Sequence, residues 1–329
     1  MIGILIWTTE AETWLHLSDF RWWVIPIVFG LASLRWIFDG MVFHALTGHS
    51  PGKRVRPLRT AVIRLIGNLI SVVVPVFVGV FSAHTYLLKR EKLQWGESVA
   101  VTIMRAVLPV FLFLFNIPIM LWWRMQGNER TALQTTIEAL MIPVIGAVIL
   151  VAAGLFFPER IHRVVSSVVR RLRRDPLRIA ALEEKLAGEF MHFSRVFRCY
   201  FREKFGCLAA ACGWLLAMFA ADSAVAISIV RGFGFRPDPV QALAFLFMIW
   251  PIVYLMPTPA GTGAFEFSYL GFYALFMPTA LIGLAVLIVR IMLTYLPMIA
   301  GSVLLVREFR KDSRLKSMVM KGKFAGADA

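Results

Sequence analysis

A broken, acid-bearing stretch, LMPTPAGTGAFEF, interrupts one of the most apolar parts of the chain. Pro259, Gly261 and Gly263 break the helix that the surrounding apolar residues predict, and Glu266 follows closely. Non-helical backbone at membrane depth is tolerated only where it is buried in protein or lines a wet cavity. A half-helix that starts near Thr262 or Gly263 would direct free N–H groups and the positive end of its dipole into such a cavity. The stretch therefore predicts an anion site.

An arginine within the next apolar span supplies a matching cation. Arg290 lies 27 residues after Gly263. A buried guanidinium is costly without a partner, and it suits bidentate binding of a phosphate or carboxylate. An alternative is a structural ion pair between Arg290 and Glu266 that locks the broken segment to the last helix. The two roles do not exclude each other.

A second break with a following arginine occurs earlier in the chain. Pro75 and Gly79 have the same spacing as Pro259 and Gly263, and Arg105 follows Gly79 by 26 residues. Each copy joins a Pro/Gly break to an arginine in the next apolar span, which predicts an internal repeat. An alternative for Arg105 is that its side chain snorkels to the cytoplasmic surface.

The elements that must position these residues are membrane helices. Hydrophobic residues make up 59% of the 329 residues, far above the roughly 45–50% of soluble domains. Apolar stretches of about 20 residues recur and predict one all-α, polytopic transmembrane domain over residues 1–329. The apolar segments are Trp22–Leu46, Ala61–Ala83, Ser98–Trp123, Ile137–Phe157, Phe205–Val230, Pro239–Phe276 and Thr279–Val306.

The net charge of +15 is concentrated in segments that we expect on the cytoplasmic side of the membrane. Residues 158–204, between the two halves of the domain, carry twelve Lys or Arg against six acids. The tail 307–329 carries seven against three, and the loop HSPGKRVRPLRT carries four against none. We therefore expect a cytoplasmic loop at 158–204, a cytoplasmic C-terminus and an N-terminus outside.

Seven full crossings do not satisfy these charges, because an odd number of crossings would separate basic segments that must share a side. The contradiction disappears if the two broken segments enter the membrane and return. About five full spans then remain, plus two re-entrant helical hairpins, the first entered from the cytoplasm and the second from outside. Such an inverted repeat is typical of transporters that bind their substrate near the bilayer midplane.

Other residues suggest little chemistry. The three cysteines lack Cys-x-x-Cys or Cys/His spacing, so the sequence predicts no metal site and no cofactor. Arg35 and Asp39, four residues apart, predict an ion pair at a helix end. The basic runs lack the interleaved aromatic residues of a nucleic-acid-binding module, so we expect no nucleic-acid partner.

The residues around the second break resemble a known family. MPTPAGTGAFEFSYLGFYALF, followed by LIVRIMLTYLPMIAGSVLL, is similar to the C-terminal signature of the flippase-like transmembrane family. This family includes the membrane domain of bacterial lysylphosphatidylglycerol synthases and stand-alone relatives. Its break carries a glutamate, and its final helix an arginine, an aromatic residue and a proline; Glu266, Arg290 and Tyr295 match. The chain departs from the family at Ala260, where a glycine is usual, and after Gly79, where an acid and an arginine are missing.

The resemblance implies a lipid transporter of the bacterial cytoplasmic membrane. It would move an anionic or aminoacylated phospholipid, or a polyprenyl-phosphate-linked lipid, between leaflets, without being an enzyme. The residues expected to bind the headgroup are Arg290, Glu266, Arg105, Gly261, Thr262, Gly263, Pro259, Gly79 and Tyr295. Two alternatives stay open: a non-catalytic membrane partner of a lipid-modifying enzyme, and a membrane enzyme that acts on a lipid phosphate.

Overall fold

The computed structural model describes residues 20–49, 54–73, 76–113, 116–125, 145–146, 199–255 and 258–311. Within these ranges all regular secondary structure is helical, which confirms the all-α prediction. The elements are α3 (Val24–Leu46), η1 (Thr47–His49), α4 (Pro57–Val73), α5 (Val76–Arg90), α6 (Trp95–Leu112), α7 (Asn116–Met125), α11 (Phe205–Gly232), α12 (Pro239–Leu255), η3 (Pro259–Gly261), α13 (Ala264–Ala274), α14 (Thr279–Arg290), η4 (Ile291–Tyr295) and α15 (Leu296–Lys311).

Four helical segments in the described ranges are long and apolar enough to cross a membrane. They are α3, α6, α11 and the continuous stretch Thr279–Glu308, and each coincides with one of the predicted full spans. The fifth predicted span, 137–157, lies outside the described residues except for 145–146, as does most of the basic loop at 158–204.

One predicted segment is divided in two. Residues from Ser98 to Trp123 were expected to form a single helix, but α6 ends at Leu112 and α7 begins at Asn116. Pro118 gives the physical reason, because proline cannot donate the backbone hydrogen bond of a helix interior but is tolerated in a first turn.

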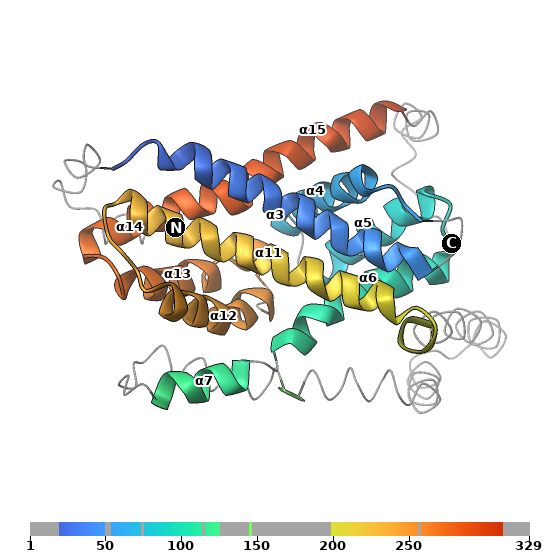
Figure 1. Ribbon diagram of the computed structural model, residues 1–329. Helices are drawn as coiled ribbons and strands as arrows, with labels where there is room; N and C mark the ends of the chain where they lie inside the picture. The colour runs from blue at the N-terminus through green and yellow to red at the C-terminus, as the bar shows by residue number, and fades with distance from the viewer. Residues whose placement is uncertain are drawn as a thin grey trace, which may run out of the picture.

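The long helices α3 and α11 lie side by side along the centre of the molecule (Figure 1). At one end the N–H of Arg21 donates to the carbonyl oxygen of Gly232 at 2.9 Å. At the other end the hydroxyl of Tyr200 donates to the carbonyl oxygen of Leu46. The start of α3 thus meets the end of α11, so the two helices run antiparallel.

Helices α4 and α5 form a hairpin in which α4 ends at Val73 and α5 begins at Val76; the predicted break at Pro75 lies between them, outside the described residues. Residues at similar distances on either side of this point meet. The Nε of Arg59 donates to Glu91, and a Cβ on Gly67 would lie only 1.9 Å from Nε2 of His84. Only a glycine lets the two helices approach so closely.

Helices α12 and α13 form a second hairpin, joined through the 3-10 turn η3. The rings of Phe245 and Phe272, one on each arm, lie with their centroids 6.1 Å apart. In the turn, Ala260, Gly261 and Gly263 have φ angles of 52°, 65° and 90°. L-residues rarely adopt these values, so the two glycines are needed for the chain to reverse here.

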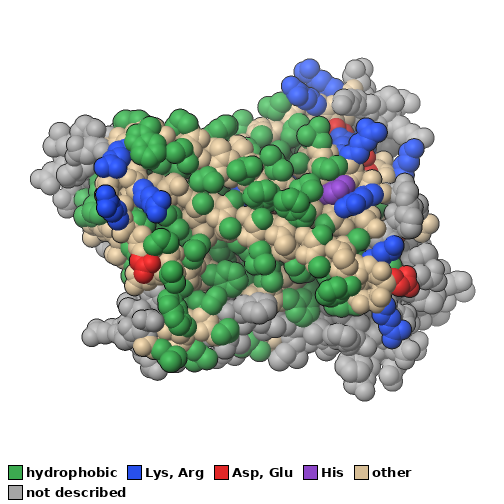
Figure 2. All heavy atoms as spheres, in the orientation of Figure 1, with side chains coloured by type: hydrophobic (Ala, Val, Ile, Leu, Met, Phe, Trp, Pro, Cys, Tyr) green, Lys and Arg blue, Asp and Glu red, His purple; other side chains and the backbone are tan. Residues whose placement is uncertain are grey.

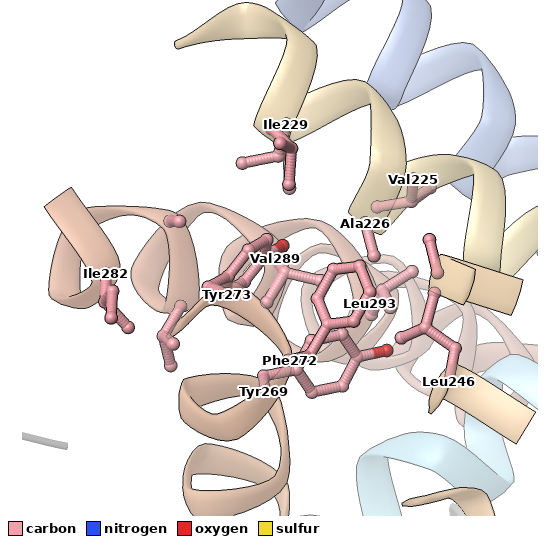
Figure 3. Packing of buried hydrophobic residues seen from close by; sticks show 14 of the residues in the cluster. Val225, Ala226, Ile229, Leu246, Tyr269, Phe272, Tyr273, Ile282, Val289 and Leu293 are labelled. Carbon is pink, nitrogen blue, oxygen red and sulfur yellow. The ribbon is translucent and has the colours of Figure 1, made fainter. Parts of the chain in front are cut away.

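An aromatic cluster ties this second hairpin to its neighbours. Tyr269, Phe272 and Tyr273 of α13 pack in one buried apolar cluster with Ile229 of α11 and Val289 of α14 (Figure 3). Aromatic side chains bury large apolar areas, so this cluster fixes the hairpin against the α3–α11 pair.

The last helical segment passes from the second hairpin to the first. Helix α14 continues through η4, a π-helical turn, into α15, and α15 packs across α4. The crossing is close, because a Cβ on Gly301 would lie 2.2 Å from the carbonyl oxygen of Leu65. Small residues at such crossings are typical of packed membrane helices.

The face of the molecule shown in Figure 2 carries an apolar band. Hydrophobic side chains cover the middle of the molecule, and Lys and Arg side chains gather at its two ends (Figure 2). On α3 alone, Ile27, Leu34 and Ile37 are exposed. Several large apolar side chains exposed on one helix favour contact with lipid over contact with water. The chain is a multi-pass membrane protein.

Candidate functional site

A cavity of about 280 Å³ lies where the two hairpins meet. Its wall is formed by α4 and α5 of the first hairpin, by α12, η3 and α13 of the second, and by α3, α6, η4 and α15. The polar side chains in this wall belong to Arg35, Arg64, Asn68, Ser71, His84, Thr102, Arg105 and Thr294.

A buried carboxylate binds two of the cavity's guanidinium groups. Asp39 of α3 is 1% exposed. Nε and Nη2 of Arg64 donate to its Oδ2 at 2.8 and 2.6 Å, and Nε and Nη2 of Arg105 donate to its Oδ1, the former at 3.2 Å. Arg105 is 4% exposed, so the alternative in which it snorkels to the surface is wrong. The buried carboxylate of Asp39 binds the Arg105 guanidinium instead.

The third guanidinium reaches a second buried carboxylate. Nε of Arg35 donates to Oδ1 of Asp222 on α11 at 3.0 Å, and Asp222 is fully buried. The prediction placed an ion pair of Arg35 and Asp39 at a helix end, and this placement is wrong. Both residues lie inside α3, which continues to Leu46, and both bind side chains of other helices. Spacing along one helix does not reveal which other helices supply partners.

These ionic groups leave the site with a surplus of positive charge. Three arginines, Arg35, Arg64 and Arg105, face two aspartates, Asp39 and Asp222, which gives 3 − 2 = +1. Electrostatic attraction is stronger in a poorly polarisable interior than in water. Guanidinium groups also match the geometry of phosphate and carboxylate oxygens. The cavity can therefore bind a monovalent anion.

Arg290 acts as a clip across the second break. Its Nη1 donates to the carbonyl oxygen of Ala260 at 3.2 Å and its Nη2 to Oγ1 of Thr262 at 3.2 Å. Its Nε lies 3.4 Å from Oε1 of Glu266, and its guanidinium carbon lies 4.5 Å from the centroid of the Phe265 ring. This geometry has the form of the structural ion pair weighed above, and Arg290 is not among the described residues that line the cavity.

The other expected ligands lie at or near the same place. Gly261 lines the cavity, and Pro259 begins the turn η3 beside it. The N–H of Gly263 donates to Oε2 of Glu266 at 2.7 Å. This hydrogen bond caps the start of α13, so the N–H is not available to an anion. Tyr295 ends the π-helical turn next to a cavity residue, Thr294.

Gly79 and Arg105 represent the first copy of the repeat. Gly79 lies within α5 of the first hairpin, and Arg105 brings its side chain to the cavity. The two arginines matched by spacing, Arg105 and Arg290, are therefore not equivalent. The first faces the cavity and the second holds the turn at its edge.

The sequence reasoning missed Arg64 and its neighbours on α4. Arg64, Asn68 and Ser71 lie at positions i, i+4 and i+7, so they share one face of the helix, and all three line the cavity. A polar stripe of this kind on an apolar segment is itself a signal for a site within the bundle.

The chain was compared with known protein families. The family described as "Lysylphosphatidylglycerol synthase TM region" matches residues 1–301. Among curated proteins and solved structures, none matches the chain at a significant level.

Proposed function

The chain belongs to the lysylphosphatidylglycerol synthase TM region family, and on that premise we propose that it is a flippase-like lipid transporter. Its cargo in this proposal is a lipid with an anionic headgroup: an anionic or aminoacylated phospholipid, or a polyprenyl-phosphate-linked lipid. The protein supplies a path between the leaflets and performs no chemistry on the lipid.

The cavity is the observation that supports this proposal most. Three buried or half-buried guanidinium groups converge on it from α3, α4 and α6. Ionisable groups inside a membrane bundle are costly and generally belong to a substrate path. The surrounding apolar surface supports a position of the cavity at the depth of the hydrocarbon region, where the guanidinium groups would replace part of the water shell of a lipid phosphate.

In the proposed mechanism the two hairpins are the moving parts. The headgroup phosphate enters between them and binds Arg64 and Arg105, while its acyl chains stay in the surrounding lipid. Asn68 and Ser71 offer further polar contacts along the same face of α4. Rocking of one hairpin against the other, as in inverted-repeat transporters, then opens the cavity to the opposite leaflet.

The distribution of basic residues supports the predicted orientation. Glu308 near the end of α15 binds Arg59 of α4 and Arg90 of α5, so the open end of the first hairpin and the end of α15 share one side. Among the described residues, this end carries Arg54, Arg56, Arg59, Lys89, Arg90, Lys92, Arg202, Lys204, Arg307 and Arg310, whereas the opposite end carries Arg21, Arg231 and Arg236. By the positive-inside rule we place the first end in the cytoplasm of a bacterial cell.

Leaflet-resolved lipid exchange tests the proposal. Purified full-length protein is reconstituted into phosphatidylcholine vesicles with a trace of fluorescent phosphatidylglycerol, and dithionite quenching reports the lipid that reaches the outer leaflet. Arg64→Gln and Arg105→Gln should each slow exchange about tenfold or more, because a charge-assisted hydrogen bond contributes about 1.5–3 kcal/mol. Arg236→Gln, at an exposed position on the opposite end, should exchange lipid like wild type.

The result that counts against the site is wild-type exchange in folded Arg64→Gln and Arg105→Gln proteins. If the wild-type chain itself moves no lipid but co-purifies with a lipid-modifying enzyme, the role of a non-catalytic membrane partner replaces transport.

A further inference from the structure

Asp222 is held on one side only. Its Oδ1 accepts the hydrogen bond from Nε of Arg35, but its Oδ2 is buried and has no hydrogen-bond partner in the described part of the protein. Buried carboxylate oxygens are normally hydrogen-bonded, and an ionised group with an unsatisfied oxygen is costly in an apolar interior. A proton on Oδ2 would remove this cost.

Among the described residues, the titratable and charged groups near Asp222 lie on α3 and α13. On α3, Arg35 binds it directly and Asp39 lies within electrostatic range. On α13, the phenol of Tyr269 lies within range of Asp222, Arg35 and Arg290. The Tyr269 hydroxyl is itself buried without a hydrogen-bond partner in the described residues, and its ring packs among apolar side chains (Figure 3). Arg35 is therefore the one cation in direct contact with this carboxylate among the groups described.

Arg35 connects this carboxylate to the cavity. Its side chain lines the cavity wall while its Nε binds Asp222. Any change in the charge of Asp222 is felt by the guanidinium that faces the anion. With Asp222 ionised the site carries +1; with Asp222 protonated the same three arginines face only Asp39, and the site carries 3 − 1 = +2.

We propose that Asp222 is a proton-binding site coupled to the anion cavity, so that the protein takes up a proton when it binds an anionic headgroup. The proton comes from water and adds to Oδ2, and no other bond forms or breaks. Protonation weakens the hold of Asp222 on Arg35, and the guanidinium then binds the anion more strongly. The inference rests on the proposed lipid transport and adds its coupling ion.

Linkage makes the coupling reciprocal. If protonation of Asp222 strengthens anion binding, anion binding must favour protonation by the same factor. Affinity for the anion should therefore rise as pH falls, by at most about tenfold per pH unit, since one proton is exchanged. A cavity that exchanges no proton when it binds holds a permanently charged anion equally at every pH.

Proton uptake on lipid binding tests the proposal without relying on transport. Purified full-length protein in weakly buffered detergent micelles is titrated with phosphatidylglycerol, whose phosphodiester keeps a single negative charge throughout the pH range of the experiment. A pH indicator measures the protons taken up. Wild type should take up as much as one proton per bound lipid, and its affinity should fall as pH rises.

Matched substitutions locate the proton. Asp222→Asn should bind the lipid with no proton uptake and with an affinity that does not change with pH. Asp222→Glu keeps a titrating carboxyl and should keep the uptake. Asp238→Asn removes an exposed carboxylate before α12 and should behave as wild type.

The outcomes separate this inference from the proposed function. If wild type binds phosphatidylglycerol but takes up no proton, or if Asp222→Asn takes up as many protons as wild type, Asp222 is not the coupling site and lipid binding stands alone. If wild type binds phosphatidylglycerol no better than phosphatidylcholine, the proposal of an anionic cargo is wrong, and the proposal of proton coupling is then wrong as well.

Discussion

Removing the Arg290 clip should destabilise the second hairpin more than it affects the cavity. Arg290→Gln loses the contacts to Ala260 and Glu266, and it leaves the Glu266 carboxylate, 2% exposed, without its opposite charge. Breaking a buried ion pair from one side costs about 3–5 kcal/mol. Loss of the cation–π contact with Phe265 adds about 1 kcal/mol. We therefore expect a loss of about 4 kcal/mol or more in the free energy of unfolding.

A double-mutant cycle separates the ion pair from its surroundings. Glu266→Gln in the Arg290→Gln background removes the unpaired carboxylate. The double variant should therefore lose about 1–3 kcal/mol less free energy of unfolding than the two single variants lose together. Unfolding is measured from tryptophan fluorescence while sodium dodecyl sulfate is titrated into mixed micelles. Strictly additive losses, or an Arg290→Gln protein within about 0.5 kcal/mol of wild type, would refute the clip.

Two further predictions concern helix contacts at the first hairpin. Gly67→Ala places a Cβ 1.9 Å from Nε2 of His84 and should destabilise by about 1–3 kcal/mol, whereas Gly213→Ala, with open space around it, should be neutral or slightly stabilising; thermal unfolding of both in detergent checks the difference. Arg59→Gln removes the ion pairs with Glu308 of α15 and with Glu91 after α5. Because Arg59 is partly exposed, we expect a loss of only about 1 kcal/mol, and a loss that does not shrink as salt is added would contradict this reading.

The sequence predicts the helical framework well because hydrophobic length and Pro/Gly breaks are local signals. The turn through Gly261 and Gly263 falls where proline and glycine exclude a continuous helix, and α4 and α5 are separate helices that end at Val73 and begin at Val76. The four described helical segments that are long and apolar enough to cross a membrane likewise overlap the predicted apolar segments. Such features need no knowledge of which helices are neighbours.

The partners of the charged residues could not be predicted from the sequence, because these ion pairs depend on packing between helices that are distant in the chain. Asp222 lies 187 residues from Arg35, and Asp39 binds arginines on α4 and α6. Spacing within α3 favoured the pair of Arg35 with Asp39. Spacing between the repeats made Arg105 and Arg290 appear equivalent, although only the first of these two lines the described cavity.

The π-helical turn η4 lets one helix serve both hairpins. Arg290 and Gly301 are eleven residues apart, which is about three turns of an α-helix and would place them on nearly the same face. The π turn over Ile291–Tyr295 inserts one extra residue between them and rotates the second half of the helix. Arg290 can thus face the turn of the second hairpin while Gly301 meets Leu65 of the first. A deletion of one residue within this turn would restore a uniform helix and set the two hairpins out of register with each other.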